Sequence, residues 1–172
     1  MKLLLIILVF GITKLHAQPD MPKAKNGMIT YENVVEMEGM PKGLLYANAK
    51  YWFSNYYKSP RVIQADSAME GVIHAKSMFS IFKEPGSTTK AGVINYTLHL
   101  IMIEGKYKYS ISNLRHTDKT EKIGSGGKLE RIEPLCTYKE MKEEQWNLIK
   151  ETADRGVKKI IDDLYLGMSL RD

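Results

Sequence analysis

The chain has 172 residues, a formal net charge of +5 and a single cysteine, Cys136. One cysteine excludes an intramolecular disulfide, so packing has to supply the stability of the fold. The excess of positive charge is too small to indicate a polyanionic partner by itself.

Residues 1–17 have the three regions of a secretory signal peptide. Lys2 precedes an apolar run from Leu3 to Ile12, and the segment closes on Leu15-His16-Ala17. This run is about half as long as the roughly 20 residues that span a bilayer. We therefore expect cleavage before Gln18 and an exported product, periplasmic or secreted, that is soluble and has no transmembrane anchor.

The first third of the mature chain predicts an arm, a strand and a helix. Residues 18–26 are rich in proline, lysine and small polar residues, which predicts a flexible arm. From Met28 to Met37, apolar and polar residues alternate with the period of a half-buried strand. Residues 44–57 predict a helix with one apolar stripe through Leu45, Ala49, Trp52 and Tyr56.

Four strands are predicted in succession, at 61–68, 71–82, 93–104 and 106–115. The third has the clearest alternation, and Gly105 after it indicates a hairpin. Residues 117–133 contain Gly124-Ser125-Gly126-Gly127, which predicts an irregular loop. This loop lacks the Lys-Ser/Thr ending of a phosphate-binding P-loop.

The C-terminal segment, 138–166, has apolar residues at helical spacing and balanced charges. A helix of this length is roughly 40 Å long and can cross a five-stranded sheet. Four successive strands are most simply joined as antiparallel hairpins, which favours an α+β fold over a doubly wound sheet. We predict one domain, 27–167, with a five-stranded antiparallel sheet and both helices on one face, followed by a tail at 168–172.

Several segments resemble a family of secreted bacterial proteins that carry a domain of unknown function described as having a TBP-like fold. They are the strand Tyr31-Glu32-Asn33-Val34-Val35, the helix start Leu44-Leu45-Tyr46, the strand segment Tyr107-Lys108-Tyr109, and the stretch from Gly126 to Cys136 before a long helix. The resemblance covers roughly residues 27–166. It implies a fold and an exported location, and it implies no activity and no functional residue.

The sheet face away from both helices is the candidate binding surface. It collects polar and apolar side chains from neighbouring strands, and apolar residues exposed among polar ones often mark a contact surface. The candidate binding residues are Lys76, Thr97, His99, Ile101 and Ile103. The leading interpretation is a non-enzymatic binding module that engages a protein, a peptide or a small apolar ligand, through this face or through a cleft between helix and sheet.

Two alternatives remain open from the sequence. One is a small hydrolase-like enzyme centred on His74 and His99, which strand pairing about the loop near Thr88 brings within one or two rungs of each other. The other is a structural homo-oligomer in which the same sheet face pairs with itself. His116 lies at the far end of its strand and is not expected to join the other two histidines.

Neither a cofactor, a metal nor a nucleic acid is predicted. The sequence has no HExxH motif and no Cys-His cluster, and Cys136 resembles a packed thiol more than a nucleophile. Residues 106–131 hold seven basic and three acidic side chains, but Tyr107 and Tyr109 fall on the core side of their strand. Export would also separate the chain from the chromosome, so we expect no nucleic-acid partner.

Overall fold

The computed structural model describes residues 19–83, 86–118, 124–135 and 141–170. Its elements in chain order are β1 (Tyr31–Glu36), α1 (Lys42–Tyr57), the 3-10 turn η1 (Pro60–Val62), β2 (Ile63–Ser67), β3 (Val72–Phe82), β4 (Lys90–Ile103), β5 (Lys106–Thr117), β6 (Gly127–Lys128) and α2 (Glu143–Met168). The predicted order of strand, helix, four strands and helix is confirmed. The expected signal peptide and Cys136 lie outside the described residues.

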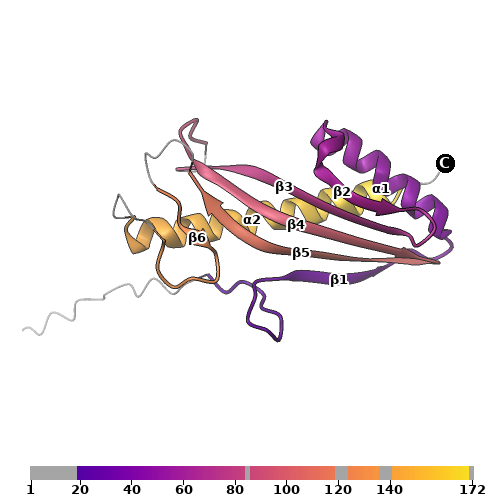
Figure 1. Ribbon diagram of the computed structural model, residues 1–172, viewed down its shortest axis with the longest axis horizontal. Helices are drawn as coiled ribbons and strands as arrows, with labels where there is room; N and C mark the ends of the chain where they lie inside the picture. The colour runs from indigo at the N-terminus through magenta and orange to yellow at the C-terminus, as the bar shows by residue number, and fades with distance from the viewer. Residues whose placement is uncertain (1–18, 84–85, 119–123, 136–140, 171–172) are drawn as a thin grey trace, which may run out of the picture.

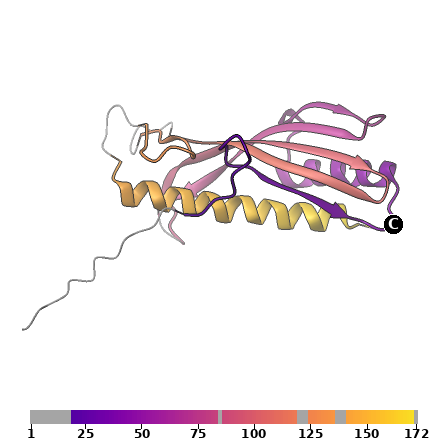
Figure 2. The same ribbon diagram turned by 90° about the horizontal axis from the view of Figure 1, so that it is seen from below.

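The strands form one antiparallel sheet in the order β1-β5-β4-β3-β2 (Figure 1). The two-residue strand β6 adds to β5 beyond the stretch that β1 pairs with, so the sheet has a sixth strand that the sequence did not predict. Both helices lie on the same side of this sheet, and α2 runs along its length (Figure 2). The predicted α+β architecture is therefore confirmed, with one face of the sheet covered and the other open.

The covered face holds the hydrophobic core. Alternation along β4 turns Leu98, Leu100 and Met102 inward, each at most 1% exposed. On α2, Val157, Ile160 and Leu164 recur at helical spacing and belong to the same core cluster.

Two contacts hold the helices in place against each other and against the sheet. The indole Nε1 of Trp52 on α1 donates to Asp163 Oδ1 on α2 at 2.7 Å. Gly156 lets the ring of Phe79 on β3 approach the backbone of α2, because a Cβ at this position would overlap the ring. The stripe predicted for α1 is right for Leu45, Ala49 and Trp52, whereas Tyr56 is 36% exposed.

The domain extends beyond both predicted boundaries. In the segment expected to be a flexible arm, Met21 is 4% exposed in the core and Lys23 forms an isolated bridge with Ile29. In the expected tail, Met168 is fully buried and the carbonyl of Leu170 accepts a hydrogen bond from Asn48 on α1 at 2.8 Å. Composition predicted a flexible arm at 18–26, and the helical pattern placed the domain end at 167, because neither can show which single side chain a distant core will accept.

The glycine-rich segment expected to be an irregular loop is regular in part. Gly127 and Lys128 form β6, and Leu129 is 1% exposed. Gly126 lies against the fully buried ring of Trp146 on α2, where any Cβ would overlap the indole. At this position glycine permits close packing, which gives it a structural role.

Candidate functional site on the open face of the sheet

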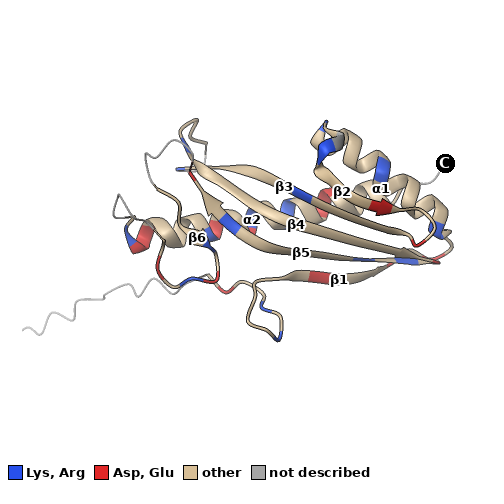
Figure 3. Cartoon of the chain, in the orientation of Figure 1, with Lys and Arg blue, Asp and Glu red and all other residues tan. Residues whose placement is uncertain are grey.

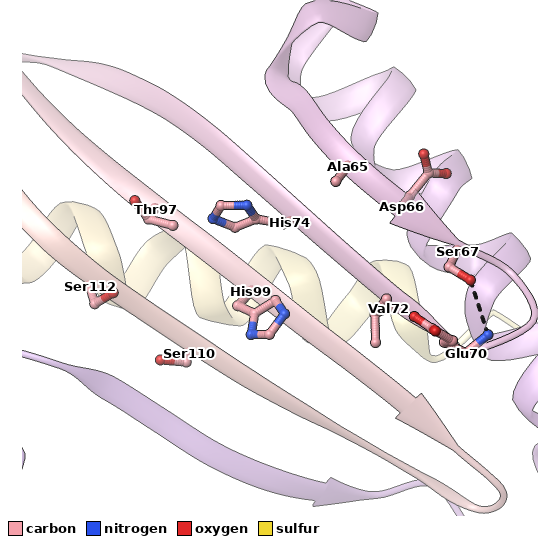
Figure 4. Close-up of a pocket in the computed structure, with 10 residues that line it drawn as sticks. All are labelled: Ala65, Asp66, Ser67, Glu70, Val72, His74, Thr97, His99, Ser110 and Ser112. Carbon is pink, nitrogen blue, oxygen red and sulfur yellow. Dashed lines mark hydrogen bonds between the residues drawn. The ribbon is translucent and has the colours of Figure 1, made fainter.

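The open face of the sheet is hollowed near the turn between β2 and β3 (Figure 4). The hollow has a volume of about 620 Å³ and opens to solvent. Four strands and one turn contribute its lining residues, which are Ala65, Asp66, Ser67, Glu70, Val72, His74, Thr97, His99, Ser110 and Ser112. Imidazoles, hydroxyls, two carboxylates and short apolar groups therefore share one concave surface.

Strand register sets the polar groups of the hollow in cross-strand rows. His74 on β3 lies directly opposite His99 on β4, and His99 lies opposite Ser110 on β5. Two residues before His99 on β4, Thr97 lies opposite Ser112 on β5. The two histidine rings have centroids 5.8 Å apart with their planes at 84°. The sequence predicted these histidines within one or two rungs of each other, and they occupy the same rung.

The imidazole of His99 favours its neutral form. Partial burial lowers its pKa below the ordinary value, and the nearby His74 and Lys108 lower it further because each disfavours a second positive charge. Lys108 itself is 3.1 Å from Glu32 on β1. In the part of the chain that the structure describes, neither His74 nor His99 has a hydrogen-bond partner, so their ring nitrogens are available to solvent and to ligands.

The five predicted binding residues divide into two groups. Thr97 and His99 line the hollow, while Lys76, Ile101 and Ile103 lie on the same face outside it. Ile103 is 45% exposed near the β4–β5 turn, and Ile101 is half-buried. The structure thus places all five on one face and gathers only two of them into the concave part.

Sequence reasoning missed the acidic side of the hollow. Asp66 and Ser67 belong to β2, and Glu70 belongs to the turn that follows it. The carboxylate of Asp66 accepts from Lys50 at 2.8 Å and from the hydroxyl of Tyr46, and these bonds lower its pKa. No local signal marks these residues, since their place depends on how β2 pairs with β3.

His116 differs from His74 and His99 in its burial and in its hydrogen bonds. It is fully buried on the helix-covered face, beside Trp146. Its Nδ1 accepts from the backbone N–H of Gly126 at 2.9 Å, so its Nε2 carries the proton and donates to the carbonyl of Ala91 at 2.7 Å. Burial also lowers its pKa. His116 is a structural neutral imidazole, kept apart from the open face.

A smaller cleft lies on the other side of the sheet, between α2 and the strands β1 and β5. It has a volume of about 390 Å³ and includes Val35, Tyr107, Tyr109, Tyr165 and Leu166 in its lining. Leu166 is 66% exposed and Tyr165 is 50% exposed. This cleft lies between a helix and the sheet, and it is more apolar than the open-face hollow.

Three further properties of the described residues are the distribution of charge, the grouping of metal-ligating side chains and the character of the helices. Both signs of charge are interspersed over the strands and helices (Figure 3). Among the described residues, no group of three or more His, Cys, Asp or Glu side chains is arranged to hold a metal ion. Within that same part of the chain, both helices fall short of the combination of length and apolar character needed to cross a bilayer.

The antiparallel sheet, with two helices on one face and an open opposite face, is an α+β domain, and its fold is TBP-like. Residues 31–117 match the DUF4468 family, a domain of unknown function with TBP-like fold. The chain belongs to this family, as the resemblance of its segments predicted.

Two solved structures are similar to the chain over most of its length. A TBP-like protein from Parabacteroides distasonis ATCC 8503 is 17% identical and has a TM-score of 0.68, covering 87% of this chain and 97% of that one. A DUF4468 family protein from Bacteroides ovatus ATCC 8483 is 14% identical with a TM-score of 0.64, covering 92% of this chain and 94% of that one. At these identities the likeness shows the fold alone. No curated protein matches the chain.

Proposed function

We propose that the protein is an exported, non-enzymatic binding module whose open sheet face engages a protein, a peptide or a small apolar ligand. The observation that carries the proposal is the hollow of about 620 Å³ on that face. Ligand sites of proteins are concave, of roughly 300–1,000 Å³, and combine apolar surface with a few placed polar groups. The hollow has this size and this mixture, with Val72 among its imidazoles and hydroxyls.

The arrangement of the histidines favours binding over the hydrolase-like alternative. Activation of a hydroxyl nucleophile needs a hydrogen bond to a base, and the base is oriented in turn by a third group. Ser110 lies opposite His99, yet within the described chain no hydrogen bond joins the two side chains, and no carboxylate is bonded to either His74 or His99. A surface that binds has no need of such a relay.

Native mass spectrometry of the protein isolated from its own host tests the proposal. We expect a co-purifying mass on the wild-type chain that is lost in the open-face variant Val72→Thr/Ile101→Thr, which removes an apolar side chain that lines the hollow and its cross-strand neighbour. It should be retained in Tyr51→Ser, a matched control in which an apolar residue 60% exposed on α1 is removed away from both concavities. Each variant is first checked by thermal unfolding, since a collapse of the open-face variant would make that face part of the core.

Other results of the same measurement redirect or overturn the proposal. Loss of the bound mass in Leu166→Ser alone would move the site to the cleft beside α2. A dimer that dissociates in the open-face variant would favour the homo-oligomer. Bare monomer in every sample would contradict a stably bound ligand.

Export is tested on the same material. The signal-peptide pattern of residues 1–17 supports a mature chain that begins at Gln18. The intact mass of protein recovered from the periplasm or the medium should therefore lack residues 1–17. A full-length mass confined to the cytoplasm would contradict export.

A further inference from the structure

The opposed pair of His74 and His99 has the geometry of a two-point ligand for a metal ion. Both side chains project from the open face into the same hollow (Figure 4). Residues directly opposite on antiparallel strands have Cβ atoms about 4.5–5.5 Å apart. Imidazole nitrogens bind zinc at about 2.0–2.1 Å, so two of them on one tetrahedral ion lie roughly 3.3 Å apart. The two rings have centroids 5.8 Å apart on directly opposed residues, so a change of rotamer at the histidines is enough to bring one nitrogen of each ring toward this separation.

The surroundings of the pair leave its nitrogens able to coordinate. Neither ring is engaged by a hydrogen bond within the described residues, in contrast to His116, whose two nitrogens are both used. The hollow is open, so water and ions reach the rings. The nearby positive charge of Lys108 is offset by Glu32 at 3.1 Å.

We propose that His74 and His99 together bind one divalent late first-row transition-metal ion, of the Zn²⁺ or Cu²⁺ class, on the open face of the sheet. Imidazole ligands suit this class of ion. Two protein ligands leave the remaining coordination positions to water, so the ion is exchangeable and is held more weakly than a structural zinc with four ligands. The site stands on the geometry of the pair and does not require that the face bind any other molecule.

Ring-nitrogen NMR of the mature chain tests the proposal with Zn²⁺ as the probe. The protein is produced without a polyhistidine tag, stripped with EDTA, labelled with ¹⁵N in histidine and titrated near neutral pH. We expect the resonances of His74 and His99 to shift together and to saturate at one Zn²⁺ per chain. The resonances of His116 should stay in place and serve as an internal control, because its nitrogens are buried and bonded.

Single and double substitutions separate chelation from independent binding. His74→Ala or His99→Ala should each weaken Zn²⁺ binding by about 10²-fold, the usual gain from presenting two ligands on one scaffold. The double variant should then be scarcely weaker than either single one, because each single change already removes the chelate. Ser80→Ala, on the same face of β3 as His74 but outside the hollow, should leave the affinity unchanged.

Acidification gives a second measurement that does not depend on a variant folding. Metal binding to imidazole ligands weakens in acid because protons compete with the ion, so lowering the pH to about 5 should release Zn²⁺ from the wild-type chain. The proposal is overturned if the two histidines do not shift at millimolar Zn²⁺, if only one of them shifts, or if binding persists unchanged in His74→Ala and His99→Ala.

Discussion

The two faces of the sheet are built from the same strands but differ in burial: one packs against the helices and the other is open to solvent. On β4, Leu98 and Leu100 are 1% and 0% exposed beneath the helices, while their neighbour His99 points into the open hollow and lacks a hydrogen bond among the described residues. Side chains on one face are fixed by packing, and those on the other are fixed mainly by strand register. The stability of the fold therefore depends mainly on side chains of the covered face. Side chains of the open face can be substituted at a smaller cost in stability.

Adjacent residues on β4 provide the sharpest test of this difference. Leu98→Ala should lower the free energy of unfolding by about 2–5 kcal/mol, because it empties a fully packed site. His99→Ala should change it by no more than about 0.5 kcal/mol, as is usual for surface positions. Urea unfolding followed by circular dichroism measures both. Similar losses in the two variants would show that the open face is also part of the core.

The close approach of α2 to the sheet is tested at Gly156. Alanine is intrinsically better than glycine in a helix by about 1 kcal/mol. The added Cβ would nevertheless overlap the ring of Phe79, and overpacking typically costs about 1–3 kcal/mol. The two effects oppose each other, so we expect Gly156→Ala to destabilise the protein by up to about 2 kcal/mol in urea unfolding.

Gly43 in α1 is the matched control for this prediction. A Cβ there would meet no atom within 4 Å, so Gly43→Ala should be neutral or stabilising by up to about 1 kcal/mol. Phe79→Leu should restore part of the stability lost in Gly156→Ala by making room for the methyl group. A stabilised Gly156→Ala would contradict the observed contact between α2 and β3.

The same contrast between the faces explains what the sequence could predict. The period of two in β4 and the period of three to four in α2 are local patterns, and they correctly predicted which side chains face the core. Pairing neighbouring strands with like faces together also correctly predicted that His74 lies near His99. The burial of Met21, the contact of Gly126 with Trp146 and the place of Asp66 in the hollow depend on segments far apart in the chain. No local pattern carries such information, so boundaries and part of the candidate site were missed.

The pH dependence of stability should report the buried histidine of the covered face. Burial lowers the pKa of His116 in the folded state below its unfolded value of about 6.5. The unfolded chain therefore binds the proton more readily, and the stabilising contribution is present above about pH 6.5 and is lost as the pH falls below it. One such group changes the free energy of unfolding by at most about 1.4 kcal/mol per pH unit.

His116→Gln should flatten this dependence between about pH 7 and pH 5.5. Its amide can still donate to the carbonyl of Ala91, whereas the titrating nitrogen is gone. Urea unfolding at several pH values gives the slope for the wild type and the variant. His99→Ala serves as the comparison, and a larger flattening there than in His116→Gln would place the dominant acid-sensitive group on the open face.

The smallest expected effect lies at the edge of the hollow, where Lys108 influences His99 without touching the core. Lys108 lowers the pKa of His99 less than burial and His74 do, so Lys108→Met should raise that pKa slightly in metal-free protein. The ion pair with Glu32 is exposed, and its loss should cost no more than about 1 kcal/mol. A histidine NMR titration would show the resonance of His99 moving its midpoint upward while that of His116 stays unchanged. An equal shift at His116 would mean that charge on the open face is felt through the sheet, and the two faces could then not be treated as electrostatically separate.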